Sequence, residues 1–170
     1  MALRFDHHVI WITGASSGIG RALALELARQ GASLALSARR VERLESLVRE
    51  IEGLGRQALA VPCDVTDELS IRAAVEQVVV RFGQLDVAVA NAGFSVSGRV
   101  ERLDAGEWRR QLDTNVIGVA LTARYALPEL RRRRGRLVLV GSVSAFLPGP
   151  GTGAYAASKA AVRSLGETLG

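Results

Sequence analysis

Apolar segments alternate with amphipathic segments along the whole chain. Five short runs are almost continuously apolar and have the length of strands: His8–Thr13, Ser33–Ala38, Gln57–Pro62, Leu85–Ala90 and Arg136–Ser142. A run without polar alternation is typical of a parallel strand that is covered on both faces. We therefore predict five buried parallel strands.

The segments between these strands follow the helical period. The predicted helices are Gly18–Gln30, Val41–Leu54, Glu68–Phe82, a long helix over Asp104–Arg133, and a fifth that begins near Ala154. A glycine follows each of the first four, where a left-handed C-cap is favoured: Gly31, Gly55, Gly83 and Gly135. The repeated strand–helix–strand order predicts right-handed crossovers and an α/β fold with a doubly wound parallel sheet. No linker or repeat divides the chain, so residues 1–170 are predicted to form a single domain.

Composition and charge narrow the class of protein. The chain has 170 residues, of which 48% are hydrophobic and 23% are charged, as in a folded globular protein. A net charge of +5 raises the question of nucleic-acid binding. The one arginine run, Arg131–Arg134, lies at a predicted helix end, where cations complement the helix dipole. No basic stripe is interleaved with aromatic residues, so we predict a solvated helix end and no nucleic-acid partner.

Cysteine and histidine usage predicts neither disulfides nor a metal site. Cys63 is the only cysteine, and His7 and His8 are adjacent, which is a poor arrangement for chelation. The N-terminal segment lacks the pattern of a cleavable signal, and no apolar run reaches the length of a membrane span. The prediction is a cytoplasmic protein without a membrane partner.

A glycine-rich segment, "TGASSGIG", joins the first strand to the first helix. Gly14, Gly18 and Gly20 let the backbone turn tightly and approach a pyrophosphate, at which the helix N-terminus aims its free N–H groups. No Gly-Lys-Ser/Thr follows, which excludes a P-loop nucleotide triphosphatase. A tight turn that only packs a helix on a sheet is the alternative.

The second predicted strand ends in Ala38, followed by Arg39 and Arg40. In many dinucleotide-binding folds a carboxylate near this position binds the ribose 2′-hydroxyl. Here a guanidinium could hold a 2′-phosphate instead, which favours NADP(H) over NAD(H). Alternatively the arginines are surface residues that open the next helix, an interpretation that suits Arg40 better than Arg39.

Tyr155 and Lys159 are four positions apart and share a helix face. Lys159 can place a positive charge near the phenol oxygen and favour the phenolate, and such a phenol can exchange a proton with an alcohol or a carbonyl. Alone, the pair could also be a surface tyrosine packed along a lysine stem. Ser142 ends the fifth strand, where its hydroxyl could donate to a substrate oxygen. A serine hydrolase is excluded because G-x-S-x-G is absent and no histidine follows.

These segments occur together and in a characteristic order: "TGASSGIG", "CDVTD", "ANAG", the Asn of "DTNVIG", Ser142 and "YAASK". With them the chain resembles the short-chain dehydrogenase/reductase family over its whole length, departing only mildly at Ala90, where the family often has Asn. The resemblance implies a Rossmann fold with strand order 3-2-1-4-5 and a homodimer or homotetramer in the full-length protein.

The resemblance also implies roles for single residues. A proton-relay tetrad would consist of Asn115, Ser142, Tyr155 and Lys159. In it Tyr155 is the acid/base, Ser142 holds the substrate oxygen, Lys159 also binds the nicotinamide ribose, and Asn115 positions a water. The implied cofactor-binding residues are Gly14, Ser16, Ser17, Gly18, Ile19, Gly20, Arg39, Asp64, Val65, Asn91, Ala92, Gly93, Tyr155 and Lys159. A simpler interpretation makes Asp64 a turn residue and Asn115 the partner of an interrupted helix backbone.

The implied activity is hydride transfer between NADP(H) and a small-molecule secondary alcohol or ketone. Family members are usually longer, so the resemblance predicts that two further strands and a substrate lid lie beyond Gly170. Residues 1–170 would then be an NAD(P)-binding Rossmann domain that is incomplete at its C-terminus. The alternative is a non-catalytic dinucleotide-binding module or an inactive truncated remnant.

Overall fold

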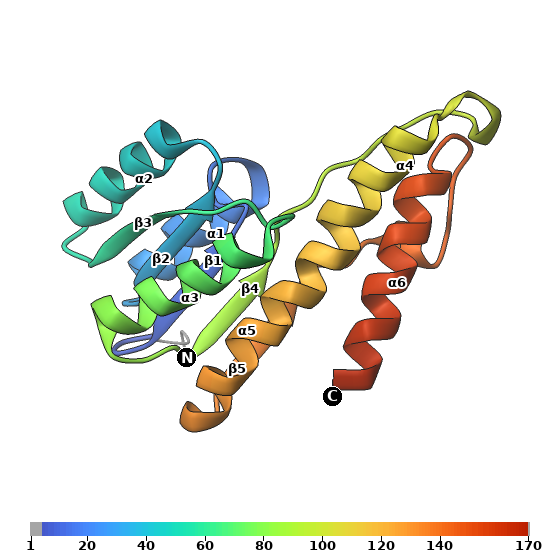
Figure 1. Ribbon diagram of the computed structural model, residues 1–170. Coiled ribbons are helices and arrows are strands. Elements are labelled where there is room, and N and C mark those ends of the chain that lie inside the picture. The colour runs from blue at the N-terminus through green and yellow to red at the C-terminus, as the bar shows by residue number, and fades with distance from the viewer. Residues whose placement is uncertain (1–4, 170) are drawn as a thin grey trace.

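The computed structural model describes residues 5–169 and contains one five-stranded parallel sheet (Figure 1). Its strands are β1 (Val9–Thr13), β2 (Ser33–Ala38), β3 (Ala58–Pro62), β4 (Val87–Ala90) and β5 (Arg136–Leu139). Their order across the sheet is β3-β2-β1-β4-β5, and every neighbouring pair is parallel. The predicted fold class and strand order are therefore confirmed.

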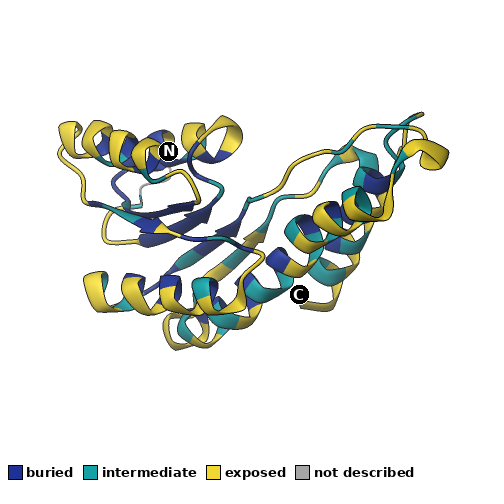
Figure 2. Ribbon diagram, turned by 45° about the horizontal axis from the view of Figure 1, so that its top comes forward, coloured by how far each residue is buried: buried dark blue, intermediate teal, exposed yellow. Residues whose placement is uncertain are grey.

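Helices cover both faces of the sheet, which explains the continuous apolarity of its central strands. One face packs against α1 (Gly18–Arg29) and α2 (Val41–Gly53), and the other against α3 (Glu68–Phe82) and α5 (Gly118–Arg133). Successive residues of a strand point to opposite faces. In β1, Ile10 and Ile12 accordingly join the α1/α2 core, while Val9 and Trp11 join the α3/α5 core. Buried residues follow the sheet and the inner sides of the helices (Figure 2).

The predicted long helix is one rod with an irregular turn inside it. α4 (Ala105–Leu112) leads into a π-helical turn, η2 (Asp113–Ile117), and then into α5. Asp104 caps α4, because its carboxylate accepts the N–H of Glu107 at 2.8 Å. The final helix, α6 (Gly153–Leu169), runs beside α4 (Figure 1). Two short 3-10 turns, η1 (Val100–Arg102) and η3 (Val143–Ala145), precede α4 and α6.

Three of the four predicted left-handed glycines are confirmed. Gly31, Gly55 and Gly83 have φ of 107°, 74° and 75°. The prediction for Gly135 was wrong, because Arg134 takes the left-handed conformation instead, with φ of 51°. Gly135 is needed for space, since a Cβ there would lie 2.4 Å from the Asp86 carbonyl oxygen.

β5 differs from its prediction in length and in burial. It ends at Leu139 rather than Ser142, and it is only partly covered, with Val138 42% exposed. The reason is its place at the edge of the sheet, where it pairs only with β4. Among residues 5–169, no helix combines the length and apolarity that a membrane crossing requires.

Candidate functional site

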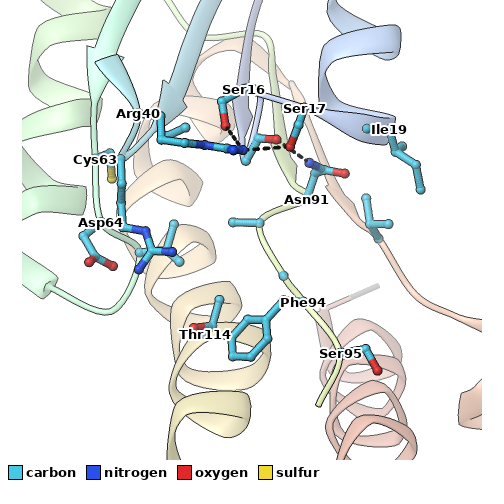
Figure 3. Close-up of a pocket in the computed structure, with 18 of the residues that line it drawn as sticks. Ser16, Ser17, Ile19, Arg40, Cys63, Asp64, Asn91, Phe94, Ser95 and Thr114 are labelled. Carbon is cyan, nitrogen blue, oxygen red and sulfur yellow. Dashed lines mark hydrogen bonds between the residues drawn. The ribbon is translucent and has the colours of Figure 1, made fainter. Parts of the chain in front are cut away.

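A cavity of about 700 Å³ opens at the carboxyl ends of the strands (Figure 3). It lies where the strand order reverses between β1 and β4, which is where open α/β sheets bind ligands. Its wall consists of Gly14, Ser16, Ser17, Gly18, Ile19, Ala38, Arg39, Arg40, Cys63, Asp64, Val65, Asn91, Ala92, Gly93, Phe94, Ser95, Thr114, Val140, Gly141, Tyr155 and Lys159.

The glycine loop between β1 and α1 is anchored on the end of β4. The Thr13 hydroxyl oxygen accepts the N–H groups of Asn91 and Ala92, both at 3.1 Å. The Asn91 amide nitrogen in turn donates to the carbonyl oxygens of Thr13 at 2.9 Å and Gly14 at 3.3 Å. These bonds fix the loop in place without using the N–H groups at the start of α1.

Two of the three loop glycines, Gly18 and Gly20, serve different purposes. Gly18 has φ of 56°, and no atom lies within 4 Å of the point that a Cβ would occupy, so this glycine is required for conformation. At Gly20 a Cβ would lie 2.5 Å from the Asn91 amide nitrogen and 2.6 Å from the Gly14 oxygen, so this glycine is required for close packing. Ser17 caps α1 without a side-chain bond, which leaves the first N–H groups of the helix available to an anion.

Two arginines lie at the rim of the cavity beside the glycine loop. Arg40 donates from its Nη2 atom to the hydroxyls of Ser16 and Ser17, both at 3.0 Å (Figure 3). Arg39 lies close enough to Asp64 to act on its charge. The sequence interpretation that Arg40 only opens α2 missed its reach across to the glycine loop. In the sequence, the available signal for this contact was a second arginine directly after the end of a strand.

The end of β3 supplies a carboxylate and a thiol to the wall. Burial alone would raise the pKa of Asp64, but the backbone N–H of Thr66 at 2.9 Å and its hydroxyl at 2.8 Å, with the Arg39 charge, hold that pKa below its ordinary value. Asp64 is therefore ionised at neutral pH. Burial raises the pKa of the neighbouring Cys63 thiol, which is only 5% exposed.

Tyr155 and Lys159 enter the same cavity from α6. The Lys159 ammonium donates to the Val140 carbonyl oxygen at 2.7 Å and lies 5.9 Å from the centre of the Tyr155 ring. Lys159 is 5% exposed, and its burial lowers its pKa. The structure thus brings the phenol and the ammonium into the wall of one cavity, which Phe94 and Ser95 also line.

Asn115 lies in η2, and its side chain is completely buried. Its Oδ1 accepts the N–H of Phe94 at 3.1 Å, and its Nδ2 donates to the Phe94 carbonyl oxygen at 2.9 Å and to the Ser158 hydroxyl at 3.0 Å. It does not line the cavity, although its neighbour Thr114 does. The side chain therefore satisfies backbone groups, and a water-positioning role for Asn115 stays a prediction.

Ser142 lies beside the large cavity rather than in its wall. Its hydroxyl oxygen accepts the N–H of Ser144 at 3.1 Å at the start of η3. It lines a second cavity of about 220 Å³, together with apolar residues that include Phe146 and Val162. Gly141 lines both cavities, so the two adjoin at this residue.

Most of the predicted cofactor residues meet in one place. All of them except Gly20, which is buried behind the loop, line the large cavity. The wall residues that sequence reasoning missed are Ala38, Arg40, Cys63, Phe94, Ser95, Thr114, Val140 and Gly141. Each of them except Ser95 directly adjoins a predicted residue or a strand end, and this adjacency was the available signal. Within the described part of the chain, no cluster of histidine, cysteine and acidic side chains could hold a metal ion.

Comparison with known proteins gives extensive matches. A family model described as short chain dehydrogenase matches residues 8–170. An 11-beta-hydroxysteroid dehydrogenase A of Sesamum indicum is 43% identical over 163 residues, which are 95% of this chain and 47% of that protein. The chain thus spans about half the length of this relative.

Two solved structures have nearly the same fold. An alcohol dehydrogenase from Thermococcus sibiricus, complexed with 5-hydroxy-NADP, has a TM-score of 0.93 and 37% identity, with 95% of this chain and 69% of that chain covered. A short chain dehydrogenase/reductase from Burkholderia phymatum, in complex with NAD, has a TM-score of 0.94 and 33% identity, with 99% and 60% covered. Because these two carry different dinucleotides, the likeness alone does not choose between the two cofactors.

Proposed function

Because the chain belongs to the short-chain dehydrogenase family, we propose that its cavity binds NADP(H) and that Tyr155 exchanges a proton with a secondary alcohol or ketone. One observation carries this proposal: Tyr155 and Lys159 line the same cavity as the glycine loop and the two rim arginines. A dinucleotide spanning that cavity would connect the arginines with the phenol. Membership of the short-chain dehydrogenase family supports the class of reaction, which is oxidation and reduction.

The shape and charge of the cavity suit a dinucleotide phosphate. The glycine loop and the N-terminus of α1 form a cradle for the pyrophosphate. Arg39 and Arg40 are the cations available to a 2′-phosphate, and no carboxylate follows Ala38 at the end of β2 to repel it. Asp64 and Val65 line the part of the wall that the proposal assigns to the adenine. The bound cofactor would supply or accept the hydride.

The proton would be handled by residues of α6 and of the segment that follows β5. In the direction of reduction, the Tyr155 hydroxyl donates its proton to the carbonyl oxygen of the substrate, and in oxidation it takes the proton back. Lys159 is held by the Val140 carbonyl oxygen, with its Nζ atom 5.9 Å from the centre of the Tyr155 ring. The Ser142 hydroxyl only accepts a hydrogen bond within the described chain, so its own O–H is free to donate to the substrate oxygen.

A non-catalytic dinucleotide-binding module is the second candidate. The placement of Ser142 favours it, because this hydroxyl lines a cavity separate from the one that Tyr155 lines. In such a protein the cofactor would bind, but the substrate oxygen could not be held between Ser142 and Tyr155.

The test is a titration of the full-length protein with NADPH and with NADH at the same salt concentration, combined with turnover measurements. NADPH should bind more tightly, and Arg39→Ala or Arg40→Ala should each weaken that preference by about tenfold to a hundredfold, the effect of one lost charge-assisted hydrogen bond. Arg49→Ala is the matched control, because this exposed α2 arginine does not line the cavity. Equal affinities in the unmodified protein would refute the preference for NADP(H).

Tyr155→Phe separates the two candidate functions. The variant keeps the ring and should bind NADPH like the unmodified protein, but it should lose turnover because it has no proton to give. Turnover by Tyr155→Phe would assign the proton to another acid. NADPH binding by a full-length protein that reduces no ketone and oxidises no alcohol would support the binding module.

A further inference from the structure

The segment after β4 is attached to the rest of the protein by two buried amide side chains. Gln111, in the last turn of α4, donates from Nε2 to the Phe94 carbonyl oxygen at 2.6 Å and accepts the N–H of Val96 on Oε1 at 2.6 Å. Asn115, one turn further along, bonds both the N–H and the carbonyl oxygen of Phe94. Both amide side chains are fully buried.

These two side chains make all the hydrogen bonds of the Phe94–Val96 backbone that the described chain contains. Asn115 binds both backbone groups of Phe94, and Gln111 binds the Phe94 carbonyl and the Val96 N–H. The N–H groups of Ser95 and Ser97 donate no hydrogen bond within residues 5–169. The position of this segment therefore depends on Gln111 and Asn115 rather than on regular secondary structure.

Asn115 also connects the Phe94–Val96 segment to α6, the helix that carries Tyr155. Asn115 donates to the Ser158 hydroxyl at 3.0 Å, and Ser158 donates to the Tyr155 carbonyl oxygen at 2.7 Å. Ser158 is fully buried. Phe94 and Ser95 line the cavity on the side away from Arg40 (Figure 3). A rearrangement at Phe94 would thus alter the cavity where the phenol stands.

We infer that Gln111 is a positioning residue, which holds the Phe94–Val96 segment in the shape that the nicotinamide half of the cofactor requires. The inference rests on the proposed function, since that function places the nicotinamide at the Tyr155 end. Leaving a buried amide without hydrogen-bond partners costs free energy, so these bonds persist in the folded protein. The adenine end shares no hydrogen bond with Gln111 and should be unaffected by its replacement.

The test compares two ligands by isothermal titration calorimetry on the full-length protein. NADPH spans the whole cavity in the proposed function, whereas adenosine 2′,5′-bisphosphate occupies only the rim and adenine end. Gln111→Met keeps the length of the side chain and removes both hydrogen bonds. It should weaken NADPH binding on the order of tenfold, as expected for lost hydrogen bonds, and leave the bisphosphate affinity unchanged. Gln77→Met, at an exposed position of α3, is the matched control and should change neither affinity.

Equal weakening of both ligands by Gln111→Met would show a general structural defect and overturn the inference, as would unchanged NADPH binding. An unmodified protein that binds neither ligand would refute the proposed function itself, and the Gln111 role with it, which distinguishes this outcome from the other two.

Amide hydrogen exchange tests the same contacts without relying on a variant that must fold. In the unmodified protein the Val96 amide should exchange at least about tenfold more slowly than the amides of Ser95 and Ser97, because only Val96 donates to a buried acceptor. In Gln111→Met the Val96 amide should exchange like its neighbours. A Val96 amide that exchanges as fast as its neighbours in the unmodified protein would overturn the inference.

Discussion

Replacing Gly20 by alanine should disrupt the glycine loop. The added Cβ would lie 2.5 Å from the Asn91 amide nitrogen, 2.6 Å from the Gly14 oxygen and 3.1 Å from the Ala15 Cα. The Asn91 side chain can move, but the other two atoms belong to the backbone, so the loop must shift relative to α1. A shift of this kind would displace the surface that the proposed function assigns to the pyrophosphate.

The expected cost follows from the contacts. Overpacking of a tight site costs about 1–3 kcal/mol. Moving Asn91 also weakens its bonds to the carbonyl oxygens of Thr13 and Gly14, each worth about 0.5–1.5 kcal/mol. The better helix propensity of alanine offsets about 1 kcal/mol of this loss in the free energy of unfolding. We therefore expect the free energy of unfolding to fall by roughly 1–4 kcal/mol and NADPH binding to be lost.

Two other glycines provide the controls. Gly53 ends α2 with no atom within 4 Å and no positive φ, so Gly53→Ala should raise the free energy of unfolding by up to about 1 kcal/mol. Gly18 also has open space but a φ of 56°, so Gly18→Ala should lose about 1–2 kcal/mol through strain alone. Urea denaturation and NADPH titration of the three variants measure both effects. A Gly20→Ala protein with unchanged stability and NADPH affinity would refute the packing argument.

Three further outcomes follow from burial and from the sheet edge. Burial lowers the pKa of Lys159 from its ordinary value of 10.5, so the unfolded chain binds more protons between the folded value and 10.5, and stability from this group rises with pH across that window. The Lys159→Met protein should not show this rise in the free energy of unfolding. If urea denaturation showed the same pH dependence for both proteins from neutral pH upward, the expectation would be contradicted. Burial raises the pKa of Cys63, so iodoacetamide should modify it more slowly than a free thiol, and more slowly still with NADPH bound; modification at the rate of a free thiol would argue against its place in the wall. Because β5 is an edge strand with Val138 42% exposed, Val138→Lys should raise the monomeric fraction of a 170-residue protein in size-exclusion chromatography, and no change would show that this edge does not self-associate.

Local sequence was enough to predict the helices and strands, and the family resemblance added most of the cavity wall. The continuous apolarity of β1 and β2 predicts strands covered on both faces, because no other environment buries both sides of a strand. Glycines that need a positive φ, such as Gly18, are visible in a sequence because few other residues adopt that conformation. Most of the residues that the family resemblance assigns to a cofactor also meet at the cavity, because parallel strands place their carboxyl ends, and hence the residues that follow them, at one edge of the sheet.

Other features depend on contacts between segments far apart in the chain, and only the tertiary structure decided them. Position 135 requires glycine because the Asp86 carbonyl oxygen leaves no room for a Cβ atom. The Arg40 side chain is directed by its hydrogen bonds to the hydroxyls of the glycine loop. Gln111 reads as a polar residue of an amphipathic helix, yet it is fully buried because the Phe94–Val96 segment needs partners for its backbone. A pattern along one helix records which side chains are polar, but it cannot show which distant backbone groups they satisfy, since that is fixed only when the segments pack together.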